Sequence, residues 1–464
     1  MKKLPIAICL TVVCLLSVQF YSLTNTSTQQ PPLTADRFPD YGFLASDYSG
    51  TVFKLSQDYP KTLPAGSKPA FFKTDFRKDW KKYMLQVRDY CFEGNTNIDF
   101  RVENNSVRGW YHMPWQHWDP NGQGREGIHG LTKEAPVQPR QLAPTQTIDS
   151  AGAWAVGFYN DIGAYTIGQV WKDHYNPDAS VTSGPKGGFK QGAVLFKLLF
   201  ASLPPDQAAA QVPSLANGLW WDAYVSTNFA SQTRVNTKVA LIQMDILVRD
   251  ERAPTKWIAG TFQYNGQLNE ANKWENLAPL GLMWGEDPQQ TASTFTNATP
   301  TVTRINPALK ETVINPDVAE LPATHLGWNG RLNGPVDNPQ SSCFSCHATA
   351  QYPQASPISP LFSGPTSKFK PGSKEWMLWF QNYQCATVFA GVNDPQQLAG
   401  VKSTDFSLQL AGALQNFDTW KLAQNGLFAV EHVNTTLKKS MLLLTKSGKP
   451  GFKNRTVYTI RRNL

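Results

Sequence analysis

The sequence predicts an α+β protein in which a β-rich N-terminal region is followed by a mainly α, loop-rich C-terminal region. Hydrophobic residues alternate over 240–248 and again over 258–264, on either side of a turn at 251–255. This period of two is typical of a pair of antiparallel strands. Residues 404–422 instead place their apolar side chains at helical spacing. Stretches rich in Gly, Asn, Pro and Ser lie within the second region and predict loops.

Composition limits the class of protein. The 464 residues are enough for more than one hydrophobic core, and 41% hydrophobic with 17% charged residues is ordinary for a soluble globular chain. The formal net charge of +8 contains no long basic run, so the sequence does not favour nucleic-acid binding. The cluster at 77–82 is interpreted as a solvated face.

The N-terminus carries a targeting signal. Lys2 and Lys3 precede a mostly apolar run over 4–20, the pattern of an export signal. The run is slightly long for a cleaved peptide and slightly short for a membrane span, so residues 1–21 are assigned as a signal peptide or an N-terminal anchor. We therefore expect a periplasmic or otherwise extracytoplasmic protein, attached to the membrane if the anchor is retained.

Four segments follow from this pattern. Residues 1–21 are the signal or anchor, and the polar stretch over 22–45 reads as a linker. Residues 46–320 form a β-rich domain of unknown role, with further strands expected at 107–115 and 154–159 and a helix at 74–88. Residues 321–464 form the second domain, with loops at 327–335 and 353–371 and helices at 374–389 and 404–422.

The most specific motif is the C-x-x-C-H formed by Cys343, Cys346 and His347. Two thiols at this spacing can form thioethers with the two vinyl groups of one porphyrin, and the adjacent histidine then reaches one axial face of the iron. A zinc site would need two more ligands, and no second C-x-x-C is present. The surrounding Pro/Asn-rich loops do not provide the βαβ setting of a redox dithiol.

This motif and its placement resemble those of bacterial c-type cytochromes, in particular large single-haem proteins with a C-terminal cytochrome region. The resemblance covers only Cys343, Cys346 and His347. It implies one covalently bound haem c, held by Cys343 and Cys346, with His347 as the proximal iron ligand. It also implies that residues 321–464 form a cytochrome c-like haem domain.

The second axial ligand is left open by the sequence. His325 lies 22 residues before His347 in the same loop-rich region and is our first choice. Met377 lies 30 positions after His347, within an aromatic segment where a core role is common. His129 is a third candidate, from the first region, and the sixth position of the iron can also be open.

Other polar residues have a structural and a functional interpretation. The stretch 109–119 contains His112 and His117 among four large aromatic residues; with His129 these can line a substrate pocket or a second redox site. We favour a buried aromatic strand with hydrogen-bonded histidines. Asp245 and the acidic pair at 286–287 are interpreted as turn-capping groups.

Two cysteines remain outside the motif and the signal region. In an oxidising compartment Cys91 and Cys385 can form a disulfide that joins the two regions, and the other interpretation is two free buried thiols.

The function expected from these observations is electron transfer to or from a redox partner protein through the covalent haem. The alternative is a haem-dependent oxidoreductase, either peroxidase-like with an open haem face or with a separate active site in the N-terminal domain. Whether the chain is an enzyme is left open. A haem-based gas sensor is the third hypothesis. It is the least favoured, because the sequence shows no recognisable signalling module.

Overall fold

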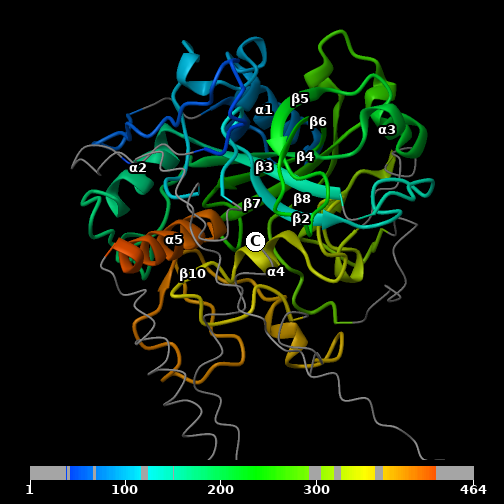
Figure 1. The fold of residues 1–464 in the computed structure, drawn as a ribbon. Coiled ribbons are helices and arrows are strands. Elements are labelled where there is room, and N and C mark those ends of the chain that lie inside the picture. Colours follow the sequence, from blue (N-terminus) through cyan, green and yellow to red (C-terminus); the bar gives the residue numbers. More distant parts are fainter. Residues whose placement is uncertain are drawn as a thin grey trace, which may run out of the picture.

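The computed structural model describes residues 38, 42–65, 69–116, 124–149, 151–291, 305–317, 326–360 and 369–424 (Figure 1). The predicted signal segment 1–21 lies outside these residues, as does most of the predicted linker. Within the described ranges, no helix is both long enough and apolar enough to cross a membrane.

A nine-stranded antiparallel sheet forms the centre of the structure. Its strands follow the order β1-β3-β4-β6-β7-β8-β9, with β2 paired to β3 and β5 paired to β6. The strands of this sheet are β1 (Trp110–Tyr111), β2 (Thr132–Val137), β3 (Ala151–Asn160), β4 (Val194–Ala201), β5 (Trp220–Val225), β6 (Val235–Arg249), β7 (Trp257–Tyr264), β8 (Leu277–Met283) and β9 (Thr312–Ile314). A second sheet pairs β10 (Gln351–Tyr352) with β11 (Lys402–Ser403).

The predicted antiparallel pair at 240–248 and 258–264 is confirmed by β6 and β7. Gln243 lies opposite Gln263, and Arg249 lies opposite Trp257 at the end next to the turn. The alternation holds because successive side chains of a strand point to opposite faces of the sheet. The strand predicted at 154–159 is confirmed by β3, whereas of 107–115 only Trp110 and Tyr111 pair.

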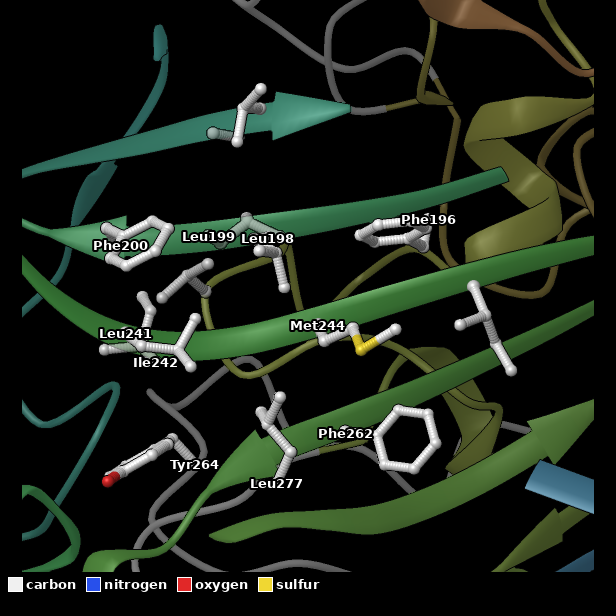
Figure 2. Close-up of a cluster of buried hydrophobic side chains, with 14 of the residues drawn as sticks. Phe196, Leu198, Leu199, Phe200, Leu241, Ile242, Met244, Phe262, Tyr264 and Leu277 are labelled. Atoms are coloured by element: carbon white, nitrogen blue, oxygen red, sulfur yellow. The ribbon is translucent and has the colours of Figure 1, made fainter. Parts of the chain in front are cut away.

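Helices cover both faces of this sheet. They are α1 (Trp80–Phe92), α2 (Asp161–Val170), α3 (Pro205–Gln211), α4 (Cys343–His347) and α5 (Leu408–Gln424). One face packs Phe196, Met244 and Phe262 into a core that also contains buried residues of α1 and α3 (Figure 2). The opposite face packs its apolar side chains against α2, α4 and α5. In Figure 1, α4 and α5 lie below the sheet and α2 lies to its left.

The predicted fold class is wrong for the C-terminal region. Within the described part of 321–464 only α4 and α5 are α-helices, and α4 has five residues; the remainder is turns, short 3-10 segments and the β10–β11 pair. The described part of the chain is therefore β-rich, and residues 326–360 and 369–424 do not form the mainly α, loop-rich haem region that the sequence predicted.

The segment 374–389 explains this error. It contains only a 3-10 turn at Trp376–Leu378, and Ala386 has a left-handed backbone with φ of 58°. Its aromatic side chains pack in a separate cluster with Trp328 instead of forming a stripe along a helix. A short apolar run does not distinguish these outcomes.

The two other predicted helices are confirmed in part. The helix expected at 74–88 begins later, at Trp80, because the Asp79 side chain accepts a hydrogen bond from Lys82 N and caps that position. The helix expected at 404–422 is α5, which begins at Leu408.

One hydrophobic cluster includes residues from both predicted domains. Leu195, Leu247 and Trp257 of the sheet share it with Phe344 of α4 and Leu410 of α5. The C-x-x-C-H segment is therefore packed directly against the large sheet.

Candidate functional site

The C-x-x-C-H motif forms the short helix α4, and Ser342 caps its start. Ser345 N donates to Ser342 Oγ at 3.0 Å, and Ser342 N donates to Ser345 Oγ at 2.8 Å. Such a reciprocal capping box satisfies two backbone donors that a helix start leaves without partners. A five-residue helix has little intrinsic stability, so this cap and the packing around it must hold the motif in place.

A buried ion pair anchors the capped end of α4. Ser342 Oγ donates to Glu286 Oε1, and Glu286 Oε2 lies 3.2 Å from Nε of Arg331. The guanidinium of Arg331 also packs over the rings of Trp328 and Phe380, at 4.7 and 5.1 Å from their centroids. These contacts link α4 to the loops on both sides of it.

Cys343 and Cys346 are free, partly buried thiols. Burial raises the pKa of Cys346 to about 11, and burial together with the carboxylates of Asp245 and Asp337 raises the pKa of Cys343 well above its usual value. Both cysteines are therefore protonated at neutral pH. Nucleophilic cysteines are thiolates at neutral pH, so this environment does not favour a nucleophilic role.

The ring of His347 is oriented by one hydrogen bond. Its Nδ1 lies 2.8 Å from the backbone carbonyl oxygen of Phe406. Because a carbonyl only accepts, Nδ1 carries the proton, and since burial lowers the pKa of His347 to about 4, Nε2 carries none. No described residue hydrogen-bonds to Nε2. An unprotonated Nε2 with its Nδ1–H bonded to a carbonyl is the form of histidine that binds iron.

A row of polar residues crosses the sheet on the face that packs against α4. Lys197 of β4 lies opposite Asp245 of β6, which lies opposite Thr261 of β7. Thr261 Oγ1 donates to Asp245 Oδ1 at 3.1 Å, and the Thr261 hydroxyl also interacts with the thiol of Cys343. The face of the sheet that meets the motif is therefore apolar at its margins and charged at its centre.

A small hollow lies between β10 and α5. It is lined by Gln351, Gln354, Ile358, Leu408, Ala411, Gly412 and Gln415. The Gln351 side chain is almost fully buried, and neither its oxygen nor its nitrogen has a partner among the described residues. The hollow has room for about one water molecule, which could hydrogen-bond to the Gln351 amide, and it is too small for a porphyrin.

The candidates for the second axial ligand are placed as follows. His325 lies outside the described residues. Met377 is buried among the tryptophans of the cluster around Trp328, which is the core role. Both ring nitrogens of His129 have partners, with Nδ1 2.9 Å from Asp222 O and Nε2 3.3 Å from Asp99 Oδ2, so neither is free to bind iron.

The aromatic stretch around His112 has the structural role that we favoured. His112 is fully buried, and its Nδ1 accepts a hydrogen bond from Ser56 N at 3.0 Å. Trp115 packs against Phe417 of α5. His117 lies outside the described residues. Within the described ranges, no three His, Cys, Asp or Glu side chains are arranged to hold a metal ion.

The acidic residues singled out in the sequence divide between two roles. Asp287 accepts from Lys310 N at 2.7 Å and Glu311 N at 2.9 Å, which is a capping role. Glu286, which is fully buried, and Asp245, which is partly buried, instead contact the surroundings of the motif. Sequence reasoning missed Lys197, Arg331 and the Phe406 carbonyl. The only sequence signal for Lys197 is a lysine within an otherwise apolar strand.

The chemistry of the residues on α4 fits a covalently attached haem: two thiols at the required spacing, followed by a histidine whose Nδ1 is hydrogen-bonded to a carbonyl and whose Nε2 has no partner among the described residues. Comparisons of the chain with protein-family models, with curated proteins and with solved structures find no match.

Proposed function

We propose that this chain is an exported monohaem protein, similar to c-type cytochromes, that transfers electrons through one haem held by Cys343 and Cys346. The observation that carries the proposal is the 2.8 Å hydrogen bond from His347 Nδ1 to the Phe406 carbonyl. It fixes the neutral tautomer whose Nε2 binds iron, in the residue that directly follows the second cysteine.

In this proposal the haem supplies one-electron chemistry, since its iron alternates between two oxidation states. The chain supplies attachment and orientation. Cys343 and Cys346 hold one edge of the group, His347 provides the proximal nitrogen, and the apolar side chains packed against α4 restrict water.

The proposal includes an extracytoplasmic location and a redox partner protein. The N-terminal pattern of Lys2, Lys3 and an apolar run supports export, and covalent haem attachment in bacteria takes place outside the cytoplasm. The formal net charge of +8 favours a partner with an acidic docking face.

The test is expression of the full chain with a haem-maturation system, followed by a pyridine haemochrome spectrum and metal analysis. We expect one c-type haem, low-spin in both oxidation states, with no second metal. Cys343→Ala and Cys346→Ala should each leave a single thioether, and the double variant should bind no haem covalently. Cys385→Ala is the matched control and should retain both thioethers.

Other spectra would change the proposal. A high-spin spectrum that shifts with carbon monoxide or peroxide, or a second bound metal, would favour the haem-dependent oxidoreductase instead. Absence of covalent haem from the wild-type chain would overturn both functions.

A further inference from the structure

The turn that presents the Phe406 carbonyl to His347 has an unusual backbone. Asp405 and Phe406 are consecutive residues with φ of 50° and 64°. L-residues rarely adopt this left-handed region, and a bulky side chain such as that of phenylalanine disfavours it most. A backbone of this kind persists only where the surrounding structure holds it.

The carboxylate of Asp405 provides that support. Its Oδ1 accepts from Ala386 N at 2.9 Å and from Trp257 Nε1 at 3.0 Å, and its Oδ2 accepts from Phe189 N at 2.6 Å. These donors come from three separate segments of the chain. Asp405 has no exposed surface, so each bond forms out of contact with water, where a missing partner is costly.

The packing next to Asp405 is also adapted to it. Gly188 has φ of 97°, and a Cβ atom placed on it would lie 2.7 Å from Asp405 Oδ2. Only glycine allows this approach, which brings the following residue's N–H to the carboxylate. On the other side, Asp405 N donates to Ser403 Oγ at 3.0 Å.

We propose that Asp405 is a positioning residue: by holding the 405–406 turn, it fixes the tautomer and orientation of His347 and thereby sets the reduction potential of the haem. This inference rests on the proposed function. Asp405 itself does not touch the group and acts through the Phe406 carbonyl.

The direction of the effect follows from the chemistry of the imidazole. Donation of the Nδ1 proton to a carbonyl makes Nε2 a stronger electron donor, and a stronger donor stabilises the oxidised iron. Loss of that hydrogen bond should therefore shift the reduction potential to more positive values.

The test is Asp405→Asn in the full, haem-loaded chain. Asparagine keeps the size of the side chain. Its NH2 group, however, would face an N–H donor from which the Asp405 carboxylate accepts a hydrogen bond in the wild type, so that hydrogen bond is lost. We expect covalent haem to remain, with a potential more positive than that of the wild type. In ¹⁵N spectra of the chain without haem, the signal of a protonated Nδ1 at His347 should weaken.

Asp99→Asn is the matched control. Asp99 and Phe100 form the same type of turn, with φ of 53° and 54°, and Asp99 Oδ1 likewise accepts from a tryptophan indole, that of Trp221. Phe100 belongs to the core on the opposite face of the sheet from α4. This variant should leave both the potential and the His347 signal unchanged.

The outcomes separate this inference from the proposed function. If Asp405→Asn does not fold, Trp257→Phe removes one donor to the carboxylate and should shift the potential in the same direction by a smaller amount. A folded Asp405→Asn with unchanged potential and unchanged His347 signal overturns the inference while the haem remains. If the wild-type chain carries no haem the proposed function fails, and the ¹⁵N signals still decide whether Asp405 positions His347.

Discussion

Glu286 and Arg331 form an ion pair with no exposed surface on either side chain, with Oε2 3.2 Å from Nε. Burial raises the pKa of Glu286 to about 7 although the guanidinium opposes this shift. A pair of this kind adds little net stability but is costly to break, because one charge is left buried without its partner. Since Glu286 also accepts from Ser342, the pair couples the stability of the fold to the placement of α4.

We expect Arg331→Met to lower the free energy of unfolding by about 3–5 kcal/mol, because Glu286 loses its partner. Four backbone carbonyls also lose a donor, those of Glu286, Asp287, Gln290 and Trp328. Denaturant titration of the full chain measures this. The double variant with Glu286→Gln should recover part of the loss. Lys238→Met, which breaks the exposed pair with Asp222, is the control and should cost about 1 kcal/mol or less. Equal midpoints for Arg331→Met and the control would contradict the expectation.

The cap of α4 gives a second expectation. Ser342→Ala removes the acceptor for Ser345 N and the donor to Glu286, and we expect a loss of about 1–2 kcal/mol. Because a five-residue helix depends on its cap, hydrogen exchange at Cys346 N and Ala348 N should also accelerate relative to the sheet. Ser202→Ala, which removes a buried acceptor for Gly152 N just after β4, is the control and should leave exchange at α4 unchanged. Unchanged exchange at α4 in Ser342→Ala would show that packing alone holds the motif.

The parts of the fold that local pattern determines could be predicted from the sequence. The alternation over 240–248 and 258–264 reports a strand pair joined by a short turn, and the C-x-x-C-H spacing is a complete local motif. The helix at 408–424 is visible for the same reason. In each case the residues that determine the feature are close together in the chain.

The parts determined by distant contacts could not be predicted. The partner of His347 is a backbone carbonyl 59 positions later, which has no side-chain signature. Lys197 and Asp245 meet only because β4 pairs with β6 in one register. The aromatic residues of 374–389 pack with Trp328 across a loop, so a helical interpretation of that segment failed.

The two cysteines outside the motif give a third expectation. Both are free, with Cys91 fully buried on α1 and Cys385 partly exposed, its Sγ 3.3 Å from Arg249 Nη2. Under native conditions iodoacetamide should modify Cys385 at least about a hundredfold faster than Cys91, which reacts only after the structure opens. Peptide mapping by mass spectrometry measures both rates, and denaturant should make them similar. A peptide linking Cys91 to Cys385 would contradict the free-thiol structure.

Asp245 gives an expectation for pH. Burial, and then the neighbouring Asp337, raise the pKa of Asp245 to about 7, although Lys197, Gln243 and Thr261 oppose this. Below about pH 4 the carboxyl is protonated in both folded and unfolded chains and favours neither. Between about pH 4 and 7 the unfolded chain loses this proton while the folded chain keeps it, so the stability contributed by Asp245 falls as pH rises, and it is constant above 7.

Asp245→Asn removes this dependence, because asparagine stays neutral. The stability of the variant relative to the wild type should therefore increase between pH 4 and 7, by on the order of 2 kcal/mol, since Asp245 keeps some contact with solvent. Urea titrations of the full chain at several pH values measure this difference. Histidines also titrate in this range, but their contribution to stability is the same in both chains and cancels in the difference. Asp222→Asn, an exposed carboxylate on the neighbouring strand β5, is the control. A difference that is constant with pH for Asp245→Asn would mean that the carboxylate opposite Lys197 is already ionised at pH 4, with Lys197 as its compensating charge.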